Sequence, residues 1–475
     1  MKLQKVIGLE VHVELATASK IFCSCTTKFG GAPNTHCCPV CTGMPGTLPV
    51  LNNKVLEYAV LAGLALNCEI TKYNKFDRKN YFYPDLPKAY QISQLYLPFA
   101  KNGYIDIGTK RIGIHEIHME EDAGKLIHSE NSDETFTDYN RCGVPLIEIV
   151  TEPDFSSAEE VTAFLTKIKS MFEYLGISDC KMQEGSMRAD VNLSLKEPTS
   201  EILGTRTEMK NLNSFKGIER AIKAEADRQE EIILSGGKII QETRRWDDAA
   251  GKSYSMRSKE NAEDYRYFPE PDIPPISLTD EYIERLRASI PEFSEEKAKR
   301  YVADMGLSLA DAEIIASGKF LADLFEDTVR ICENAKEVRF WIINQIMYFV
   351  NEKGLVLDNL KLSAERFAKF IQIVLSDKIN RQTGKAVFEE MVFSDESFDI
   401  EEYITKNGLA QVDDTELVRE TILKVFADNP KTVAQYKAGE TKVQGFFVGQ
   451  VMKTLRGTAR PDTVNKILAE ELTKL

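Results

Sequence analysis

Alternating apolar and polar residues predict strands through the first part of the chain. Residues 6–15 alternate strictly, so one side of this strand is apolar. Its other side carries Gly8, Glu10, His12 and Glu14. Residues 187–195 and 205–211 alternate in the same way, and we expect them to pair as neighbouring strands. Their polar faces carry Arg188, Asp190, Asn192 and Ser194, and Arg206, Glu208 and Lys210, respectively.

Helical periodicity dominates the later part of the chain. A first helix is predicted over residues 156–175, because Ser156 and Glu159 fit a capping box and Gly176 ends the apolar pattern. Residues 265–275 are proline-rich and cannot continue a regular element, and helical segments follow them. We therefore predict an α+β protein with a strand-rich N-terminal domain and two all-α parts. The predicted domains are residues 1–292, a helical domain at 293–407 and a helical tail at 408–475.

Charge is distributed unevenly along the 475 residues. The net charge of −14 argues against nonspecific nucleic-acid binding by the whole surface. Residues 431–475, however, hold eight basic and four acidic residues, which suits a phosphate-rich partner; a solvated helical face is the alternative. No apolar run is long enough to cross a bilayer, and the first residues lead directly into a strand pattern. We therefore expect neither a membrane span nor a signal peptide.

Cysteines cluster near the start of the chain. There are nine in total and five lie between residues 23 and 41, which favours reduced thiols and a cytoplasmic protein. Two close pairs of thiols suit a tetrahedral, structural zinc ion in an insertion at about residues 22–42. The predicted ligands are Cys23, Cys25, Cys38 and Cys41. His36 and Cys37 remain possible substitutes for one of the four.

Carboxylates recur on several of the predicted strands. Glu148 interrupts the apolar run 144–150, and Glu120, Glu121 and Asp122 follow His118. Carboxylates that meet in one cleft repel each other unless cations neutralise them, and oxygen ligands suit Mg²⁺. Mg²⁺ with neighbouring Arg and Lys residues suits a nucleoside triphosphate and phosphoryl transfer. The alternative is a surface that carries ordinary ion pairs.

Familiar nucleotide-binding motifs are absent from the sequence. It contains no Gly-x-x-x-x-Gly-Lys-Ser/Thr motif, no protein-kinase catalytic loop and no Gly-x-Gly-x-x-Gly motif. If ATP binds, its site is therefore of a different type. Residues 75–93 combine aromatic side chains with cations, so they could hold planar groups and phosphates or could form a self-packed loop.

Long motifs resemble one known family. KVIGLEVHVEL, FDRKNYFYPDLPKAYQIS, HMEEDAGK, RCGVPLIEIVTEPD, KNLNSF, QETRRWDD, DYRYFPEPDIPP, GFFVGQVMK and ARPDTVNKIL are similar to motifs of the GatB family, the B subunits of the aspartyl/glutamyl-tRNA amidotransferases. The resemblance implies a cradle-shaped catalytic domain, a helical domain and a tail that contacts tRNA. It also implies that ATP and Mg²⁺ are used to phosphorylate the side-chain carboxylate of Glu-tRNA(Gln) or Asp-tRNA(Asn). Ammonia from the glutaminase A subunit, which assembles with the small C subunit, then gives the amide.

The resemblance also implies roles for individual residues. One Mg²⁺ is assigned to Glu10, Asp190 and Glu208, and a second to His12, Glu121 and Glu148. Lys79, Glu121 and Glu148 are the expected catalytic residues. Arg78, Lys79, Arg188 and Lys210 are expected to bind the nucleotide, and Glu120 and Asp122 to line the ammonia route. Family members differ in their zinc ligands, so zinc is not expected to take part in the reaction.

Two other functions are compatible with the same residues. A two-metal phosphohydrolase or nuclease would use the acidic strands to cleave phosphate esters. A non-catalytic zinc-containing module would bind tRNA without turning over ATP. The sequence leaves open whether Glu-tRNA(Gln), Asp-tRNA(Asn) or both are substrates.

Overall fold

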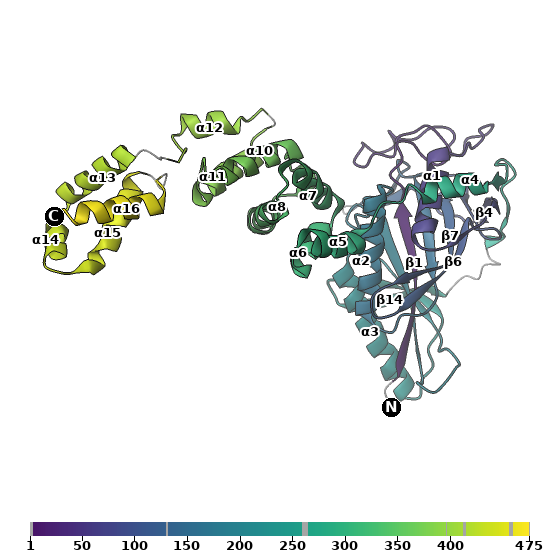
Figure 1. Ribbon diagram of the computed structural model, residues 1–475. Helices are drawn as coiled ribbons and strands as arrows, with labels where there is room; N and C mark the ends of the chain where they lie inside the picture. The colour runs from purple at the N-terminus through teal and green to yellow at the C-terminus, as the bar shows by residue number, and fades with distance from the viewer. Residues whose placement is uncertain are drawn as a thin grey trace. The chain divides into compact units, whose positions relative to one another are not determined.

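A computed structural model describes residues 3–129, 132–258, 265–395, 397–411, 415–455 and 459–474 of the chain. Asp264 and Arg456, which lie in the sequence motifs and the basic tail, fall outside the described residues. The chain forms two compact units, Met1–Phe293 and Ser294–Leu475. Strands occur in the first unit, and the described residues of the second unit form helices joined by turns and loops, which confirms the α+β prediction (Figure 1).

A nine-stranded sheet organises the first unit. Its strand order is β14-β13-β12-β11-β1-β10-β7-β6-β2, and all neighbours are antiparallel except β12 and β13. The strands are β1 (Gln4–Glu14), β2 (Glu69–Ile70), β6 (Ala100–Asp106), β7 (Arg111–Glu121), β10 (Pro145–Thr151), β11 (Met187–Lys196), β12 (Thr207–Lys210), β13 (Glu242–Asp247) and β14 (Lys252–Ser258). The predicted pairing of residues 187–195 with 205–211 is confirmed by β11 and β12.

Helices cover the apolar face of this sheet. α2 (Ala158–Leu175) and α3 (Phe215–Leu234) pack against each other, and α3 lies along β11 (Figure 1). The apolar residues of β1 share one buried cluster with Phe164 and Ile168 of α2. Because successive strand residues alternate, the polar side of β1 faces away from these helices.

The predicted first helix is present but starts slightly later than expected. The side chain of Ser157, not that of Ser156, accepts the capping hydrogen bond, from the backbone N–H of Glu160. The Ser156 N–H instead donates to the Glu160 carboxylate at 2.7 Å. Gly176 ends the helix with a left-handed φ of 67°, as its residue type predicts.

Three smaller sheets and two helices complete the first unit. β4 (Asp77–Asn80) lies between β15 (Phe268–Pro269) and β5 (Tyr90–Ser93). β16 (Ile276–Ser277) pairs with β3 (Tyr73–Asn74), and β8 (Lys125–His128) pairs with β9 (Thr135–Asp138). α1 (Asn53–Ala65) contacts α4 (Asp280–Arg287). The proline-rich residues 265–275 contain one two-residue strand, β15, and they bring Glu270 and Asp272 to β4.

The second unit contains two hydrophobic clusters. The larger one surrounds Trp341 and is drawn from α5 (Ser294–Met305), α6 (Leu309–Ala316), α7 (Lys319–Cys332), α8 (Ala335–Trp341), α9 (Met347–Lys353), α10 (Ala364–Leu375), α11 (Arg381–Phe393) and α12 (Ile400–Lys406). The smaller one is drawn from α13 (Thr415–Asp428), α15 (Gln444–Thr454) and α16 (Pro461–Leu472), with α14 (Pro430–Lys437) packed beside them. The predicted domain boundary between residues 407 and 408 stays a prediction.

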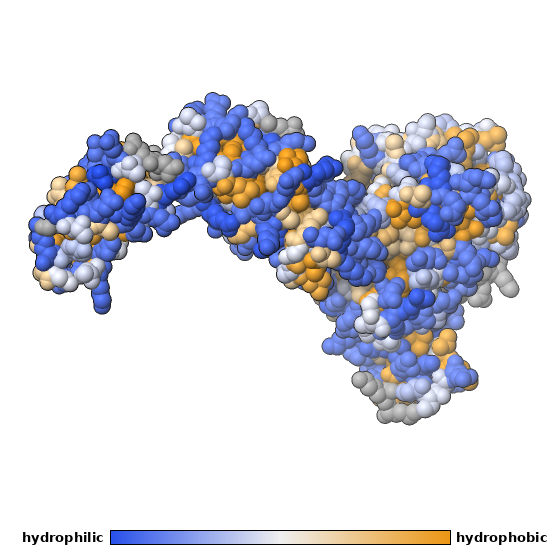
Figure 2. Space-filling view, viewed as in Figure 1, coloured by the Kyte–Doolittle hydropathy of each residue, from blue (hydrophilic) through white to orange (hydrophobic). Residues whose placement is uncertain are grey.

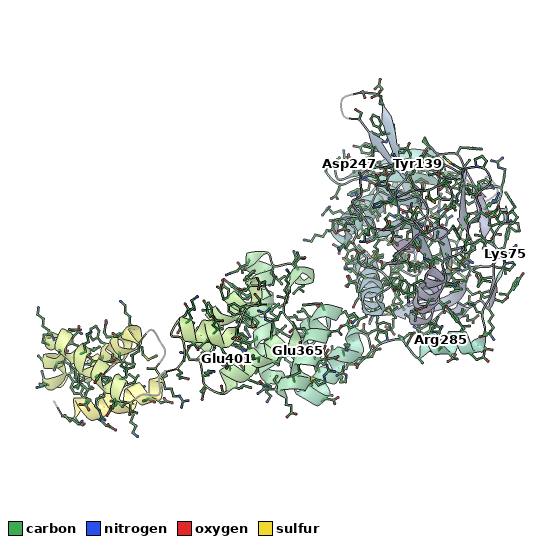
Figure 3. All side chains as sticks on the ribbon, turned by 90° about the horizontal axis from the view of Figure 1, so that it is seen from above. Lys75, Tyr139, Asp247, Arg285, Glu365 and Glu401 are labelled. Carbon is green, nitrogen blue, oxygen red and sulfur yellow. The ribbon has the colours of Figure 1, made fainter. Side chains whose placement is uncertain are left out.

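Surface ion pairs link helices of the second unit. Glu401 of α12, labelled in Figure 3, pairs with Lys369 of α10 and with Lys378 just beyond that helix. Hydrophilic residues cover most of the surface in view on both units, with smaller apolar patches between them (Figure 2). Among the described residues, no helix is long and apolar enough to span a membrane.

Candidate active site

Ionisable side chains gather on the sheet face that α2 and α3 leave uncovered. In the register of β10, β1 and β11, Glu148, His12 and Arg188 lie directly opposite one another. Glu10 lies opposite Asp190 in the same way. Residues paired across antiparallel strands point to the same side of a sheet, so these side chains share one face.

The first acidic group consists of Glu10, Asp190 and Glu208. One carboxylate oxygen from each lies within 4.8 Å of the others. The Lys210 ammonium bridges two of them, since it donates to Asp190 and lies 3.2 Å from Glu208. Burial alone would lower the pKa of Lys210, but Asp190 and Glu208 outweigh it and raise the pKa above its ordinary range.

Neighbouring amide and hydroxyl groups orient these carboxylates. The Asn192 side-chain amide donates to Glu10 at 3.0 Å. The Thr243 hydroxyl donates to Glu208 at 2.7 Å. Both donors leave lone pairs of the carboxylates available, so the group can still accept a cation.

The second acidic group consists of His12, Glu120 and Glu148, whose ligand atoms also lie within 4.8 Å of one another. His12 Nδ1 is 3.3 Å from Glu120 Oε1. Burial alone would lower the pKa of His12, but Glu148 and Glu120 raise it to about 9. For Glu120, burial favours a higher pKa, yet the His12 contact lowers the pKa to about 2. Burial raises the pKa of Glu148, so an added positive charge would stabilise its ionised form.

Glu121 does not join this second group, contrary to the placement expected from the sequence. Its carboxylate accepts hydrogen bonds from the Lys88 ammonium and, at 2.9 Å, from the Ile92 backbone N–H. The reason is the alternation of β7, which sends Glu120 and Glu121 to opposite sides of the strand. The register of β7 with β10 places His118 opposite Glu148 and therefore puts Glu120 on the shared face.

The expected nucleotide-binding cations occupy different surroundings. Lys79 of β4 has its ammonium 4.9 Å from the centre of the Tyr265 ring. Burial alone would lower the pKa of Lys79. The nearby Tyr267, Glu120 and Glu148 have the larger effect and raise this pKa above its ordinary value, so the Lys79 cation interacts electrostatically with the second acidic group. The neighbouring residue Arg78 binds Glu270 at 2.7 and 2.9 Å and Asp272 at 2.9 Å. The structure therefore does not bring Arg78 to either acidic group.

Arg188 lies on the shared face but is already paired. Its guanidinium donates to Asp122 at 2.7 Å, and Arg141 lies 3.3 Å from the same carboxylate. Glu14 adjoins this cluster; burial and the nearby Asp122 raise the pKa of Glu14 to about 8. Two carboxyl groups in contact hold a proton more readily than either would alone.

Comparisons with known proteins show the family to which the chain belongs. Residues 5–284 match the model of the GatB/GatE catalytic domain, and residues 323–472 match the GatB domain. The chain is 56% identical over 475 residues to the aspartyl/glutamyl-tRNA(Asn/Gln) amidotransferase B subunit of Lachnoclostridium phytofermentans, covering 99% of both chains. It is 54% identical over 482 residues to the corresponding protein of Caldicellulosiruptor bescii, covering 100% of both chains. This chain belongs to the GatB family of amidotransferase subunits. Both acidic groups lie within the part that matches the GatB/GatE catalytic domain.

This GatB family member also brings four cysteines together. The Sγ atoms of Cys23, Cys25, Cys38 and Cys41 lie within 4.8 Å of one another. Cys38 and Cys41 are 3.9 Å apart at sulfur, and the Cys38 backbone N–H donates to the Cys41 sulfur at 3.2 Å. A hydrogen bond from Cys23 lowers the pKa of Cys41 to about 5 and raises that of Cys23. Four sulfurs at this spacing fit a tetrahedral zinc ion.

Cys37 and His36 lie outside this group of four sulfurs. The Cys37 thiol is 3.3 Å from the Asn34 carbonyl oxygen, and the backbone N–H of His36 donates to Asn140 Oδ1 at 2.7 Å. Asn140 follows Tyr139, labelled in Figure 3, whose hydroxyl donates to the Pro84 carbonyl at 3.1 Å. The bond from His36 to Asn140 and a bond from the Asn34 backbone N–H to Asp138 at 3.0 Å hold the cysteine loop beside β9.

A cavity of about 210 Å³ lies next to the cysteine loop. Cys23, Cys41, Lys88 and Glu121 are among the residues that line it. Glu121 is therefore a wall residue of this cavity, which agrees with its separation from the second acidic group.

Proposed function

We propose that this chain is the ATP-using component of a tRNA-dependent amidotransferase. It phosphorylates the side-chain carboxylate of Glu-tRNA(Gln), Asp-tRNA(Asn) or both, and ammonia then displaces phosphate to give the amide. One observation carries the proposal: Glu10 and His12, two residues apart on β1, each belong to a separate carboxylate group on the same face. Two adjacent cation sites suit the transfer of a phosphoryl group between two anions.

The donor atoms of both groups fit Mg²⁺. The first group offers three carboxylates, and the second offers two carboxylates and one imidazole, a set rich in the oxygen donors that Mg²⁺ prefers. Bound Mg²⁺ would neutralise charge on the triphosphate and on the reacting oxygens. Glu148 and Glu120 raise the pKa of His12 to about 9, which favours its protonated form while it pairs with Glu120. It would have to release that proton before it could bind a metal.

The protein side chains hold the two anionic substrates close together. Lys79 has a fixed positive charge beside Glu120 and Glu148, so it is placed to attract the substrate carboxylate or the transferred phosphoryl group. Lys210 offers a second cation at the first acidic group. A carboxylate is a poor electrophile for ammonia, and its phosphorylation supplies the leaving group that amide formation needs.

Ammonia has to come from a partner, so we propose a complex with the glutaminase A subunit and the small C subunit of the amidotransferase. A closed path from the glutaminase would exclude water, which would otherwise hydrolyse the acyl phosphate. We assign Glu120 and Asp122 to this path, and the Arg188 guanidinium donates to Asp122 at 2.7 Å. The helical tail, residues 408–475, is proposed to contact tRNA, and the four cysteines to hold a structural zinc ion. We place the complex in the cytoplasm, where translation supplies its substrates.

The test measures ATP hydrolysis by the full complex with glutamylated and with uncharged tRNA(Gln). The proposal requires that the charged tRNA stimulate hydrolysis more than the uncharged form. It also requires a hydroxylamine-trapped acyl phosphate. Cleavage of phosphate esters without amide formation would instead identify a two-metal phosphohydrolase or nuclease, and tRNA binding without ATP turnover would identify a non-catalytic module.

A further inference from the structure

A buried lysine lies beside the four cysteines, and the proposed reaction does not use it. Lys20 follows β1 in the chain and is fully buried. Its ammonium donates hydrogen bonds to the His36 carbonyl at 2.7 Å and to Cys41 Sγ at 3.6 Å. A lysine is rarely buried in this way without an anionic partner, because burying an uncompensated charge is costly.

No carboxylate supplies that negative charge. Among the residues that the structure describes, Lys20 forms no ion pair with an Asp or Glu side chain. Glu121 and Asp272 line the same cavity as Lys20, but each of them pairs with another cation. The His36 carbonyl is neutral, so the Cys41 sulfur is the contact of Lys20 that can carry a negative charge, as a thiolate.

Lys20 contacts both pairs of cysteines. Its backbone N–H donates to the Cys25 carbonyl at 2.9 Å, beside the bridge between Ser19 and Thr26. Its side chain reaches Cys41, which belongs to the second pair. One residue therefore holds the first pair through its backbone and the second pair through its ammonium.

The backbone around Lys20 is fastened to the rest of the first unit. The Ile21 N–H donates to the Gly143 carbonyl at 3.0 Å, and the Asn52 side-chain amide donates to the Lys20 carbonyl at 3.4 Å. A Cβ built on Gly143 would lie 3.6 Å from Lys20 Cδ and 3.5 Å from Cys41 Cβ, so both side chains pack against this glycine. The position of the ammonium is therefore set by the fold.

From these contacts we infer that Lys20 is a positioning residue of the zinc site, whose ammonium orients Cys41 and offsets the charge of the thiolates. Four thiolates outnumber the two positive charges of Zn²⁺, so the group keeps an excess negative charge when the metal is bound. A hydrogen bond from a cation stabilises an anionic ligand and holds it in place. The inference rests on the structural zinc ion proposed above.

The coupling between Lys20 and the zinc site acts in both directions. Metal-bound thiolates give the buried ammonium its counter-charge, so zinc stabilises the first unit at Lys20 as well as in the cysteine loop. Removal of the Lys20 charge should therefore weaken zinc binding and also reduce the stabilisation that zinc provides.

The test measures the zinc affinity of the full-length chain by competition with a chromophoric chelator under reducing conditions. Lys20→Met and Lys20→Gln both remove the charge, and we expect each to weaken zinc binding about 10-fold or more. Lys20→Gln keeps a neutral hydrogen-bond donor, so it distinguishes the loss of charge from the loss of a hydrogen bond. Circular dichroism verifies that each variant is folded.

Two further readouts would not respond to a role in packing alone. The His36 carbonyl loses its donor in Lys20→Met with and without zinc, so this loss cancels in the difference between the two Tm values. Zinc should raise Tm by less in Lys20→Met than in the wild type. With Co²⁺ in place of zinc, the sulfur-to-cobalt charge-transfer band should shift to longer wavelength, because the Cys41 thiolate loses a stabilising hydrogen bond.

Lys28→Met is the matched control. Lys28 lies in the same loop, between the two pairs of cysteines, and is exposed. Solvent screens an exposed cation, so the loss of its charge should leave zinc affinity within about twofold of the wild type.

The outcomes separate this inference from the proposed zinc ion. If the wild type binds zinc and both Lys20 variants bind it as tightly, the inference is overturned, although the zinc ion stands. If Lys20→Met weakens zinc binding and Lys20→Gln does not, a hydrogen bond and not the charge is responsible, and the inference is again overturned. Equal weakening in Lys28→Met would also contradict it. If the wild type takes up no zinc, the proposed zinc ion fails and the inference fails with it.

Discussion

Glu10 and His12 point to the same side of β1 and are separated by a single residue, yet each belongs to a different acidic group. Glu10 meets Asp190 and Glu208, whereas His12 meets Glu120 and Glu148. The central strand of the sheet therefore links the two groups at a spacing of about 7 Å. The predictions below test the roles that this arrangement assigns.

The first acidic group should be indispensable for phosphoryl transfer. Asp190→Asn removes one negative charge and the ion pair with Lys210, so we expect acyl-phosphate formation to fall by about 100-fold or more. Binding of charged tRNA should persist. The measurement is hydroxylamine trapping of the acyl phosphate, with tRNA affinity determined in parallel. Glu231→Gln, an exposed substitution on α3, is the control and should change neither acyl-phosphate formation nor tRNA affinity. Full activity of Asp190→Asn would contradict the assignment of the first acidic group to phosphoryl transfer.

Glu120 and Glu121 should differ in metal binding although they are adjacent. Glu120→Gln removes a carboxylate of the second acidic group, and we expect about 10-fold weaker binding of one Mn²⁺ ion. Glu121→Gln should leave Mn²⁺ affinity unchanged, because its carboxylate bonds to Lys88 and to the Ile92 backbone instead. Electron paramagnetic resonance of free Mn²⁺ measures both affinities. The reverse pattern would favour Glu121 as the ligand.

Zinc binding should depend on Cys38 and not on its neighbour. Cys38→Ser should abolish the stoichiometric zinc content and lower Tm by about 5 °C, because the loop loses its cross-link. Cys37→Ser should retain zinc, since the Cys37 sulfur lies outside the group of four. Elemental analysis and thermal unfolding provide the readouts. Zinc retained in Cys38→Ser and lost in Cys37→Ser would exchange the two assignments.

Glu326 should stabilise the second unit in a pH-dependent manner. Its carboxylate accepts bonds from Lys297 at 2.6 Å, Arg300 at 2.5 Å and Tyr301 at 2.8 Å. Burial would raise the pKa of Glu326, but these donors, Lys297 and Tyr301 first, lower it below the ordinary value. Glu326→Gln should therefore cost about 2 kcal/mol at neutral pH.

The sign of the pH effect follows from that lowered pKa. The stabilisation is present above the ordinary carboxyl pKa and is lost as the pH falls through the lower pKa of the folded state. The difference between Glu326→Gln and the wild type should shrink below about pH 4. Hydrogen exchange at amides of α5 and α7 measures this stability difference as a function of pH, and Glu313→Gln, at an exposed position, is the control. A difference that is constant with pH would contradict the role of the carboxylate charge.

Strand alternation was sufficient to predict part of the candidate site. It placed Glu10 with His12, Asp190 with Asn192, and Glu208 with Lys210 on shared faces, and the antiparallel ladders bring these faces together. The position of Glu120 needed more information, because alternation within HMEE leaves two choices that only the register with β10 decides. That register depends on long-range pairing, which a local pattern does not contain.

Side-chain partners far along the chain were the other feature beyond prediction. Arg78 and Lys79 are adjacent cations in one motif, and nothing local separates their roles. The structure gives the two cations different surroundings. Glu270 and Asp272 of the proline-rich segment bind Arg78, whereas Lys79 lies near Tyr265 and Tyr267. A cavity of about 440 Å³ lined by Gly8 and Glu10 was also not predicted, since it is formed by a loop and strands that are distant in sequence.

Hydrogen bonding of β1 on both sides limits which sequence changes this protein can accept. β10 pairs with β1 on one edge and β11 on the other, through the stretch that contains both Glu10 and His12. If the pairing upstream is kept, a one-residue insertion between Gly8 and Leu9 would turn Glu10 and His12 into the apolar interior together and expose Leu9 and Val11 in their place. Substitutions can thus alter either site separately, but a change in length would inactivate both at once, so members of this lineage should vary in loop length and not within this strand.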